Sequence, residues 1–118
     1  ADPDYHCFAA LAGDALVGQV VVLPAAHTRV PGEDPGLAHL RNLFVDRSRW
    51  GSGLATTLLR TAEDDARTSG FGALRLFVAE HQARARRFYE REGWRAVTEP
   101  YFDPIPGLPM VEYRLALG

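Results

Sequence analysis

Two segments of this chain hold the residues whose types and spacing could do chemistry. The first is Arg49–Ala55, which reads RWGSGLA and places a glycine on each side of Ser52. The second is Gln82–Trp94, in which Phe88-Tyr89-Glu90 follows a group of arginines. Apolar residues at helical spacing follow the first segment, so its glycines stand where a helix begins. A helix start has N–H groups without partners, and glycine lets an anion reach them because no Cβ blocks the way. The segment therefore predicts a loop that binds phosphate or pyrophosphate, with a simple tight turn as the alternative.

Two common phosphate-binding loops do not fit this segment. A Walker A loop needs a lysine after its last glycine, and Arg49–Ala55 has none. A dinucleotide-binding fingerprint needs a third glycine where Thr56 stands, and it needs the strand to run straight into the first glycine. Here Asp46–Trp50 intervene. Dinucleotide binding is therefore kept only as a third alternative.

Another pattern fits both segments. Val45–Leu59 resembles the acetyl-CoA loop of the GNAT-type N-acetyltransferases, Arg/Gln-x-x-Gly-x-Gly/Ala after a strand that ends in valine. Gly53 and Ala55 match its last two fixed places, while Trp50 stands where Arg or Gln is usual.

The second segment is similar to another signature of the same family, Asn-x-x-Ala-x-x-Phe-Tyr-Glu-x-x-Gly-Phe. Gln82 replaces the usual Asn and Trp94 replaces the usual Phe. The matching positions are Ala85, Phe88, Tyr89, Glu90 and Gly93. Both signatures occur in the expected order, and the resemblance covers about residues 8–98.

The resemblance implies a bound acetyl-CoA, used as co-substrate, in a gap where the parallel strands Leu40–Val45 and Ala73–Val78 splay apart. Free backbone groups of the first strand would meet the pantetheine amides, as an added strand would. The helix start would hold the pyrophosphate, and nearby arginines would supply charge. The expected cofactor-binding residues are Leu43, Phe44, Val45, Trp50, Gly51, Ser52, Gly53, Leu54, Ala55, Gln82 and Arg86.

The resemblance also implies catalytic roles. Tyr89 occupies the place of the family's usual proton donor to the departing thiolate, with a core aromatic as the alternative. His39 stands where many members carry a glutamate base, and histidine accepts a proton near neutral pH. A strand-end residue near water is the alternative for His39. The histidines His6 and His27 and the single Cys7 have no metal-ligand spacing, so no metal site is expected.

The rest of the pattern predicts the elements that position these residues. Two short strands flank the Gly-Asp turn at positions 13–14, and the last strand follows a Pro-rich loop at 100–109. The expected strands are Phe8–Leu11, Leu16–Leu23, Leu40–Val45, Ala73–Val78, Trp94–Thr98 and Met110–Leu117. The expected helices run from Gly53 to Gly70 and from Arg84 to Glu92.

This order predicts an α/β (mixed α+β) fold, the GNAT-like acyl-CoA acyltransferase fold, in which helices flank a mixed sheet with splayed central parallel strands. The chain's 118 residues are expected to form a single domain, 1–118, whose N-terminal part, the family's first strand and helices, is missing or left out. One cysteine excludes an internal disulfide and fits a reducing, cytoplasmic compartment.

The expected partner is a small-molecule or peptide amine that accepts the acetyl group. The net charge of −2 favours a small polyanionic ligand over a nucleic acid, and no apolar run is long enough to cross a membrane. Homodimers through the last strand are common in such folds. Tyr101, Phe102 and Asp103, in the Pro-rich loop, could line a pocket for a cationic amine. The competing hypothesis is a non-catalytic acyl-CoA-binding or regulatory module on the same fold.

Overall fold

The computed structural model describes residues 3–32 and 34–118. The strands are β1 (His6–Ala12), β2 (Ala15–Pro24), β3 (Leu37–Val45), β4 (Ala73–Ala79), β5 (Arg95–Ala96), β6 (Tyr101–Asp103) and β7 (Leu108–Ala116). The helices are α1 (Leu54–Thr68) and α2 (Ala83–Arg91), with short 3-10 turns η1 (Ala25–His27) and η2 (Arg47–Arg49).

All seven strands form one mixed sheet in the order β1-β2-β3-β4-β7-β5, with β6 paired to β7. Only the β3–β4 pair is parallel, because α1 forms the crossover between these two strands. Every other pair is antiparallel, as expected for the opening hairpin and the last strand.

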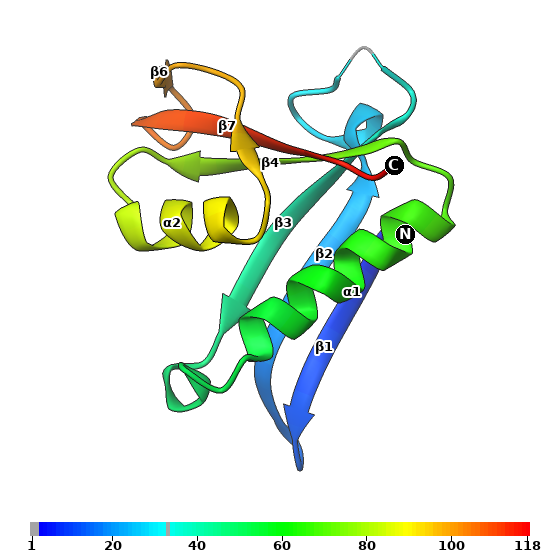
Figure 1. The fold of residues 1–118 in the computed structure, drawn as a ribbon, viewed down its shortest axis with the longest axis vertical. Coiled ribbons are helices and arrows are strands. Elements are labelled where there is room, and N and C mark those ends of the chain that lie inside the picture. Colours follow the sequence, from blue (N-terminus) through cyan, green and yellow to red (C-terminus); the bar gives the residue numbers. More distant parts are fainter. Residues whose placement is uncertain (1–2, 33) are drawn as a thin grey trace.

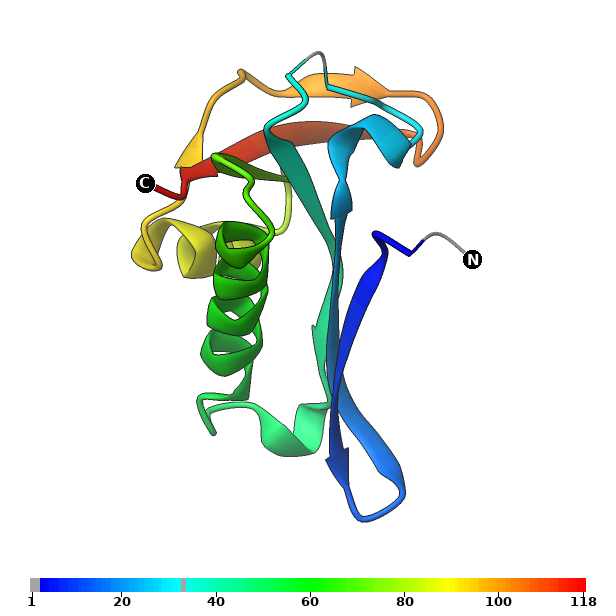
Figure 2. The ribbon, with the colours of Figure 1, turned by 90° about the vertical axis from the view of Figure 1, so that its right-hand side faces the viewer.

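Both helices lie on the same face of the sheet, with α1 against β2 and β3 and α2 beneath β4 (Figures 1 and 2). The apolar residues of α1 recur at helical spacing and turn one face toward the sheet: Leu58, Leu59, Ala62 and Ala66 are buried. They pack against alternate residues of the central strands, of which Val20, Leu40 and Leu74 are examples. This core fixes the start of α1 beside the end of β3.

The parallel pairing between β3 and β4 stops early. It contains only Leu37↔Ala73, Ala38↔Leu74 and His39↔Arg75, and beyond these pairs the two strands diverge (Figure 1). A β-bulge in β3 opposite Val20 of β2 accompanies the divergence, and Asn42 at the bulge has a φ of 57°. The expected splay of the two central strands is therefore present.

Most element boundaries lie within two residues of expectation, and the larger differences are in β3, β5 and the Pro-rich loop. β3 begins at Leu37, earlier than expected, because Leu37 and Ala38 are buried and pair with β4. The strand expected over Trp94–Thr98 is reduced to β5, since only Arg95 and Ala96 pair with β7. The Pro-rich loop at 100–109 contains β6, which forms a hairpin with the start of β7.

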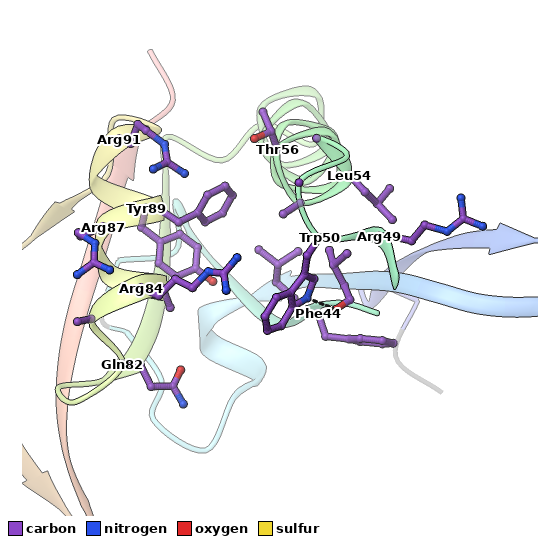
Figure 3. A pocket seen from close by; sticks show the side chains of 18 of the residues that line it. Phe44, Arg49, Trp50, Leu54, Thr56, Gln82, Arg84, Arg87, Tyr89 and Arg91 are labelled. Carbon is purple, nitrogen blue, oxygen red and sulfur yellow. Dashed lines mark hydrogen bonds between the residues drawn. The ribbon is translucent and has the colours of Figure 1, made fainter. Parts of the chain in front are cut away.

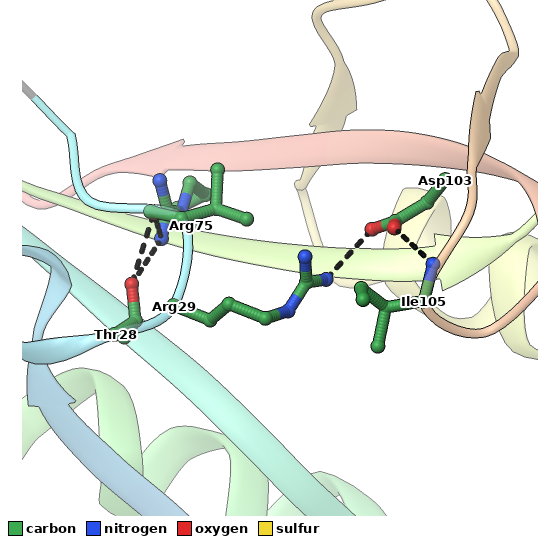
Figure 4. A network of polar contacts seen from close by, with 6 residues as sticks. Thr28, Arg29, Arg75, Asp103 and Ile105 are labelled. Atoms are coloured by element: carbon green, nitrogen blue, oxygen red, sulfur yellow. Dashed lines mark hydrogen bonds and ion pairs between the residues drawn. The ribbon is translucent and has the colours of Figure 1, made fainter.

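On the other face of the sheet, a polar cluster ties two loops to the strands. The guanidinium of Arg75 is buried and donates to Thr28 Oγ1 at 3.1 Å and to the Val30 carbonyl at 2.7 Å. Arg29, from the same loop, forms an ion pair with Asp103 of β6 at 2.8 Å (Figure 4). These contacts hold the loop after β2 against the β6–β7 hairpin.

Candidate functional site

A cavity of about 1000 Å³ lies where β3 and β4 diverge, between the end of β3, the start of α1 and α2 (Figure 3). Its lining comprises Leu43, Phe44, Val45, Arg49, Trp50, Gly51, Gly53, Leu54, Ala55, Thr56, His81, Gln82, Ala83, Arg84, Ala85, Arg87, Phe88, Tyr89 and Arg91. Four of these residues are arginines, and none is an aspartate or glutamate. The cavity is therefore strongly cationic in a chain whose net charge is −2.

The glycine loop adopts the backbone that its sequence requires. Gly51 and Gly53 have φ values of 80° and 86°, in the left-handed region that glycine adopts without strain. A Cβ built on either glycine meets no atom within 4 Å, so the two glycines leave space in front of the helix start. Asp46 begins the loop by accepting the Ser48 N–H at 3.0 Å, and its bonds to Ser48 lower the pKa of its carboxyl.

Two helix starts present backbone donors to the cavity. In α1, Leu54 N–H donates to Ser52 Oγ at 3.3 Å, while the amides of Ala55 and Thr56 have no partner among the described residues. In α2, the amides of Arg84 and Ala85 are likewise without partners in the described part of the chain. Free N–H groups and the positive ends of two helix dipoles favour an anionic ligand here.

The end of β3 forms one wall of the cavity. Phe44 and Val45 pair with Gln19 and Gly18 of β2, and no residue of β3 beyond His39 pairs with β4. The edge that faces the gap is therefore open to a ligand that hydrogen-bonds like a strand. One group of this edge is already used, since the indole Nε1–H of Trp50 donates to the Val45 carbonyl at 3.0 Å.

Tyr89 lines the same cavity from α2. Its ring packs against Trp94 and Tyr113, with centroid distances of 6.0 and 6.3 Å. Burial raises the pKa of the Tyr89 hydroxyl to about 12, so the hydroxyl keeps its proton at neutral pH. This position and protonation state are those a proton donor needs.

His39 lies elsewhere. It is buried on the face of the sheet opposite the helices, outside the cavity lining, and its Nδ1 accepts a hydrogen bond from Arg75 Nε at 3.1 Å. Burial, together with the charges of Arg75 and Arg41, lowers the pKa of His39 to about 3. The ring is neutral at pH 7 and one of its nitrogens is occupied, so this geometry does not favour His39 as a general base.

Two residues expected to bind the cofactor also lie outside the lining. Ser52 turns its hydroxyl back to the Arg49 carbonyl. Arg86 donates to the Tyr113 hydroxyl at 3.0 Å and to the Glu80 carbonyl at 3.2 Å, which ties α2 to β7 and the loop after β4. The other nine expected cofactor-binding residues all line the cavity.

The arginines of α2 that line the cavity are not the one expected from the sequence. Arg84, Arg87 and Arg91 line it, and Arg86 does not. Helical periodicity was the signal that could have separated Arg86 from the arginines that line the cavity. Residues spaced by three and four share one side of a helix, as do Arg84, Arg87, Phe88 and Arg91.

Tyr101, Phe102 and Asp103, the residues considered for the acceptor, do not line the cavity. The Asp103 carboxylate is paired with Arg29, which lowers the pKa of Asp103.

Two features are absent from the described part of the chain. Among residues 3–32 and 34–118, no group of three or more His, Cys, Asp or Glu side chains is arranged to hold a metal ion. Within the same residues, no helix has the length and apolar character needed to cross a membrane.

Comparison with known proteins agrees with this geometry. The sequence profile of the Acetyltransferase (GNAT) family matches residues 1–94. The N-acetylaspartate synthetase of Danio rerio is 33% identical over 93 residues, which are 79% of this chain and 32% of that protein. The chain thus spans about a third of the length of this relative.

Solved structures share the fold. One is an acetyltransferase of the GNAT family from Desulfovibrio desulfuricans, with a TM-score of 0.78 and 28% identity. The match covers 98% of this chain and 71% of the Desulfovibrio chain. A Bacillus subtilis acetyltransferase in complex with CoA has a TM-score of 0.72 and 22% identity, covering 96% of this chain and 77% of its own. The family profile covers most of the chain, and the sheet, the splayed strands and both signatures agree with it: the chain belongs to the GNAT acetyltransferase family.

Proposed function

We propose that this chain binds acetyl-CoA in the cavity between β3, α1 and α2 and transfers the acetyl group to a primary amine. One observation supports this most: two helix starts with free amides and four arginines surround one cavity whose wall is an open strand edge. The helix starts suit phosphates, and the open edge suits the amides of pantetheine. The CoA bound to the Bacillus subtilis relative supports the same ligand class.

In the proposed reaction the neutral amine nitrogen attacks the thioester carbon directly, within a complex of both substrates. A C–N bond forms, the C–S bond breaks, and the sulfur leaves as a thiolate. Tyr89 protonates that thiolate, since its hydroxyl lies in the cavity and holds its proton at neutral pH. The proton lost by the amine passes through water to the tyrosinate, which restores the hydroxyl.

His39 is not suited to removing the proton of the amine. With a pKa of about 3, His39 is a poor proton acceptor at neutral pH. We therefore propose that the amine loses its proton to water, and that neutral His39 together with Arg75 holds the point where β3 and β4 part.

The acceptor is proposed to be an amine that also carries a carboxylate. Arg41 is exposed on the same face of β3 as His39, two residues further into the splay, and its guanidinium lies over the ring of Tyr5. Among the described residues the Arg41 guanidinium has no hydrogen bond or ion pair, and its N–H donors suit a carboxylate. The name of the Danio rerio relative, N-acetylaspartate synthetase, denotes an amino-acid product of this kind.

The test is acetyl transfer from acetyl-CoA to a panel of amino acids and the matching decarboxylated amines, beside a calorimetric titration with CoA. We expect CoA binding and turnover, with amino acids preferred. Binding without turnover on any amine would favour the non-catalytic acyl-CoA-binding module instead.

A further inference from the structure

Trp50 departs from the family signature, and its surroundings give it a specific role. The indole is half exposed and lines the cavity directly before the glycine loop. Its Nε1–H donates to the Val45 carbonyl, which fixes the plane of the ring (Figure 3). The ring is therefore a fixed platform at the start of the proposed phosphate site, while the position itself carries no side-chain donor aimed at a phosphate.

An arginine from the opposite wall of the cavity lies against the ring of Trp50. The guanidinium of Arg84, in the first turn of α2, lies 4.3 Å from the centroid of the Trp50 ring. No hydrogen bond or ion pair of the Arg84 side chain is found among the described residues. A guanidinium that lies on an aromatic ring uses its face for that contact and keeps its N–H donors, which lie in its plane, free.

A second arginine near the ring serves as a contrast. The guanidinium of Arg47 lies 5.3 Å from the same centroid, but Arg47 does not line the cavity. Arg84 alone combines the indole contact with a place in the cavity wall. The contact with the indole thus holds the side chain of Arg84, on α2, near the start of α1.

We propose that Trp50 is a positioning residue that holds Arg84 ready to bind the pyrophosphate of the acyl donor. This inference rests on the proposed function. The family's usual side chain at position 50 would meet the phosphates itself, whereas here the indole recruits a guanidinium from α2. The expected gain in ligand affinity comes from preorganisation, because an arginine that is already held in place loses less rotamer freedom when the ligand binds.

The test is the affinity of four ligands for the wild type, Trp50→Leu, Arg84→Gln and the double variant, since leucine has neither a ring nor a donor. The ligands are pantetheine, 4′-phosphopantetheine, dephospho-CoA and CoA, and calorimetry measures each affinity. We expect Trp50→Leu to weaken dephospho-CoA and CoA by about threefold to fivefold, and to leave pantetheine unchanged. In the Arg84→Gln background the same change at Trp50 should have no further effect.

Two control variants separate this role from a merely structural one. Trp50→Phe keeps the ring face and loses the Nε1–H, so it should retain most of the wild-type affinity for CoA. Arg91→Gln removes another arginine of α2 that lines the cavity, and its effect should add to that of Trp50→Leu.

The inference fails if Trp50→Leu weakens pantetheine as much as CoA, or if its effect persists without Arg84. It also fails if the effect is seen with CoA and not with dephospho-CoA, because the arginine would then serve the 3′-phosphate. Failure of the wild type to bind any of the four ligands would instead refute the proposed function.

Discussion

At the scale of single residues, Tyr89 is the side chain on which the proposed chemistry depends. Tyr89→Phe keeps the ring that packs against Trp94 and Tyr113 and removes only the hydroxyl. We expect kcat to fall by about a hundredfold with CoA affinity nearly unchanged, since the proton is needed only as the C–S bond breaks. Steady-state kinetics with an accepted amine, beside calorimetry, measures both.

Tyr113→Phe is the matched control. The Tyr113 hydroxyl donates to Glu90 at 2.6 Å and accepts from Arg86, so its removal should lower the free energy of unfolding and leave kcat near the wild-type value. If Tyr89→Phe behaves like this control, Tyr89 is a core aromatic and the proposed proton donor is wrong.

His39 predicts a pH dependence of stability. The pKa of His39 is lowered from its ordinary value of 6.5 to about 3 in the folded protein. As the pH falls, the unfolded chain therefore binds this proton at a higher pH than the folded protein does. The contribution of His39 to the free energy of unfolding is therefore fully present above about pH 6.5. It is lost as the pH falls toward 3, by up to about 1.4 kcal/mol per pH unit. Urea unfolding between pH 7 and pH 4 measures this slope.

His39→Gln should flatten that slope, because glutamine has no proton to gain. His81→Gln, at the exposed rim of the cavity, should leave the slope as in the wild type. An unchanged slope in the His39 variant would mean that another group accounts for the acid sensitivity.

Arg86 shows how far the sequence leads at this scale. The signature located α2, and Tyr89 and Gln82 lie in the cavity wall. Helical periodicity separates Arg86 from the arginines of α2 that line the cavity, but it does not give the hydrogen bonds of Arg86 to the Tyr113 hydroxyl and the Glu80 carbonyl. Tyr113 lies 27 residues from Arg86, so no local pattern indicates this contact.

At the scale of elements, the start of α1 is the part that the ligand needs most. Gly53→Val places a β-branched side chain before the helix start, in a residue with a φ of 86°. We expect affinity for CoA to fall by more than tenfold, which is about 1.4 kcal/mol, because the side chain blocks the pyrophosphate. Calorimetry on the folded variant measures the loss.

Gly70→Val controls for backbone strain. Gly70 follows the other end of α1, has a φ of 93° and, like Gly53, has open space where a Cβ would lie. This variant should lose similar stability and keep full CoA affinity. An equal loss of affinity in both variants would show that strain alone, and no phosphate contact, explains the Gly53 result.

The bulge in β3 gives a second prediction at this scale. Asn42 is an exposed non-glycine residue in the left-handed region, which asparagine tolerates better than a β-branched residue does. Asn42→Val should destabilise the fold by about 1–2 kcal/mol, while Asn42→Gly should not. Thermal unfolding compares the two variants, and equal melting temperatures would show that the bulge does not require this backbone.

The elements themselves were largely predictable. The leucine and alanine spacing of α1 and the apolar runs of β2 and β4 each match a single period, so their type and approximate bounds were right. β6 was missed because its pairing with β7 comes from a hairpin whose sequence, rich in proline, reads as a loop. The bulge at Asn42 has no sequence signature and arises from how β3 pairs with β2.

At the scale of the whole molecule, positive charge is concentrated at the cavity, which the net charge of the chain does not reveal. The chain is slightly acidic, yet its cavity is lined by four arginines and no acidic residue. CoA affinity should therefore decrease several-fold when the salt concentration rises from 0.1 M to 1 M, where the Debye length shrinks from about 10 to about 3 Å. Pantetheine, which has no phosphate, should bind equally well at both concentrations. A salt-independent CoA affinity would contradict an electrostatic contribution from these arginines.

The three parallel pairs between β3 and β4 also have a mechanical consequence. Among the described residues they are the only β-ladder that joins β1–β3 to β4 and β7, so the sheet has a short connection about which its two parts can hinge. A ligand held by β3 and α1 on one side and by α2 on the other would restrict this motion. Amide hydrogens of Leu37–His39 and Ala73–Arg75, which do not line the cavity, should then exchange more slowly when CoA is bound.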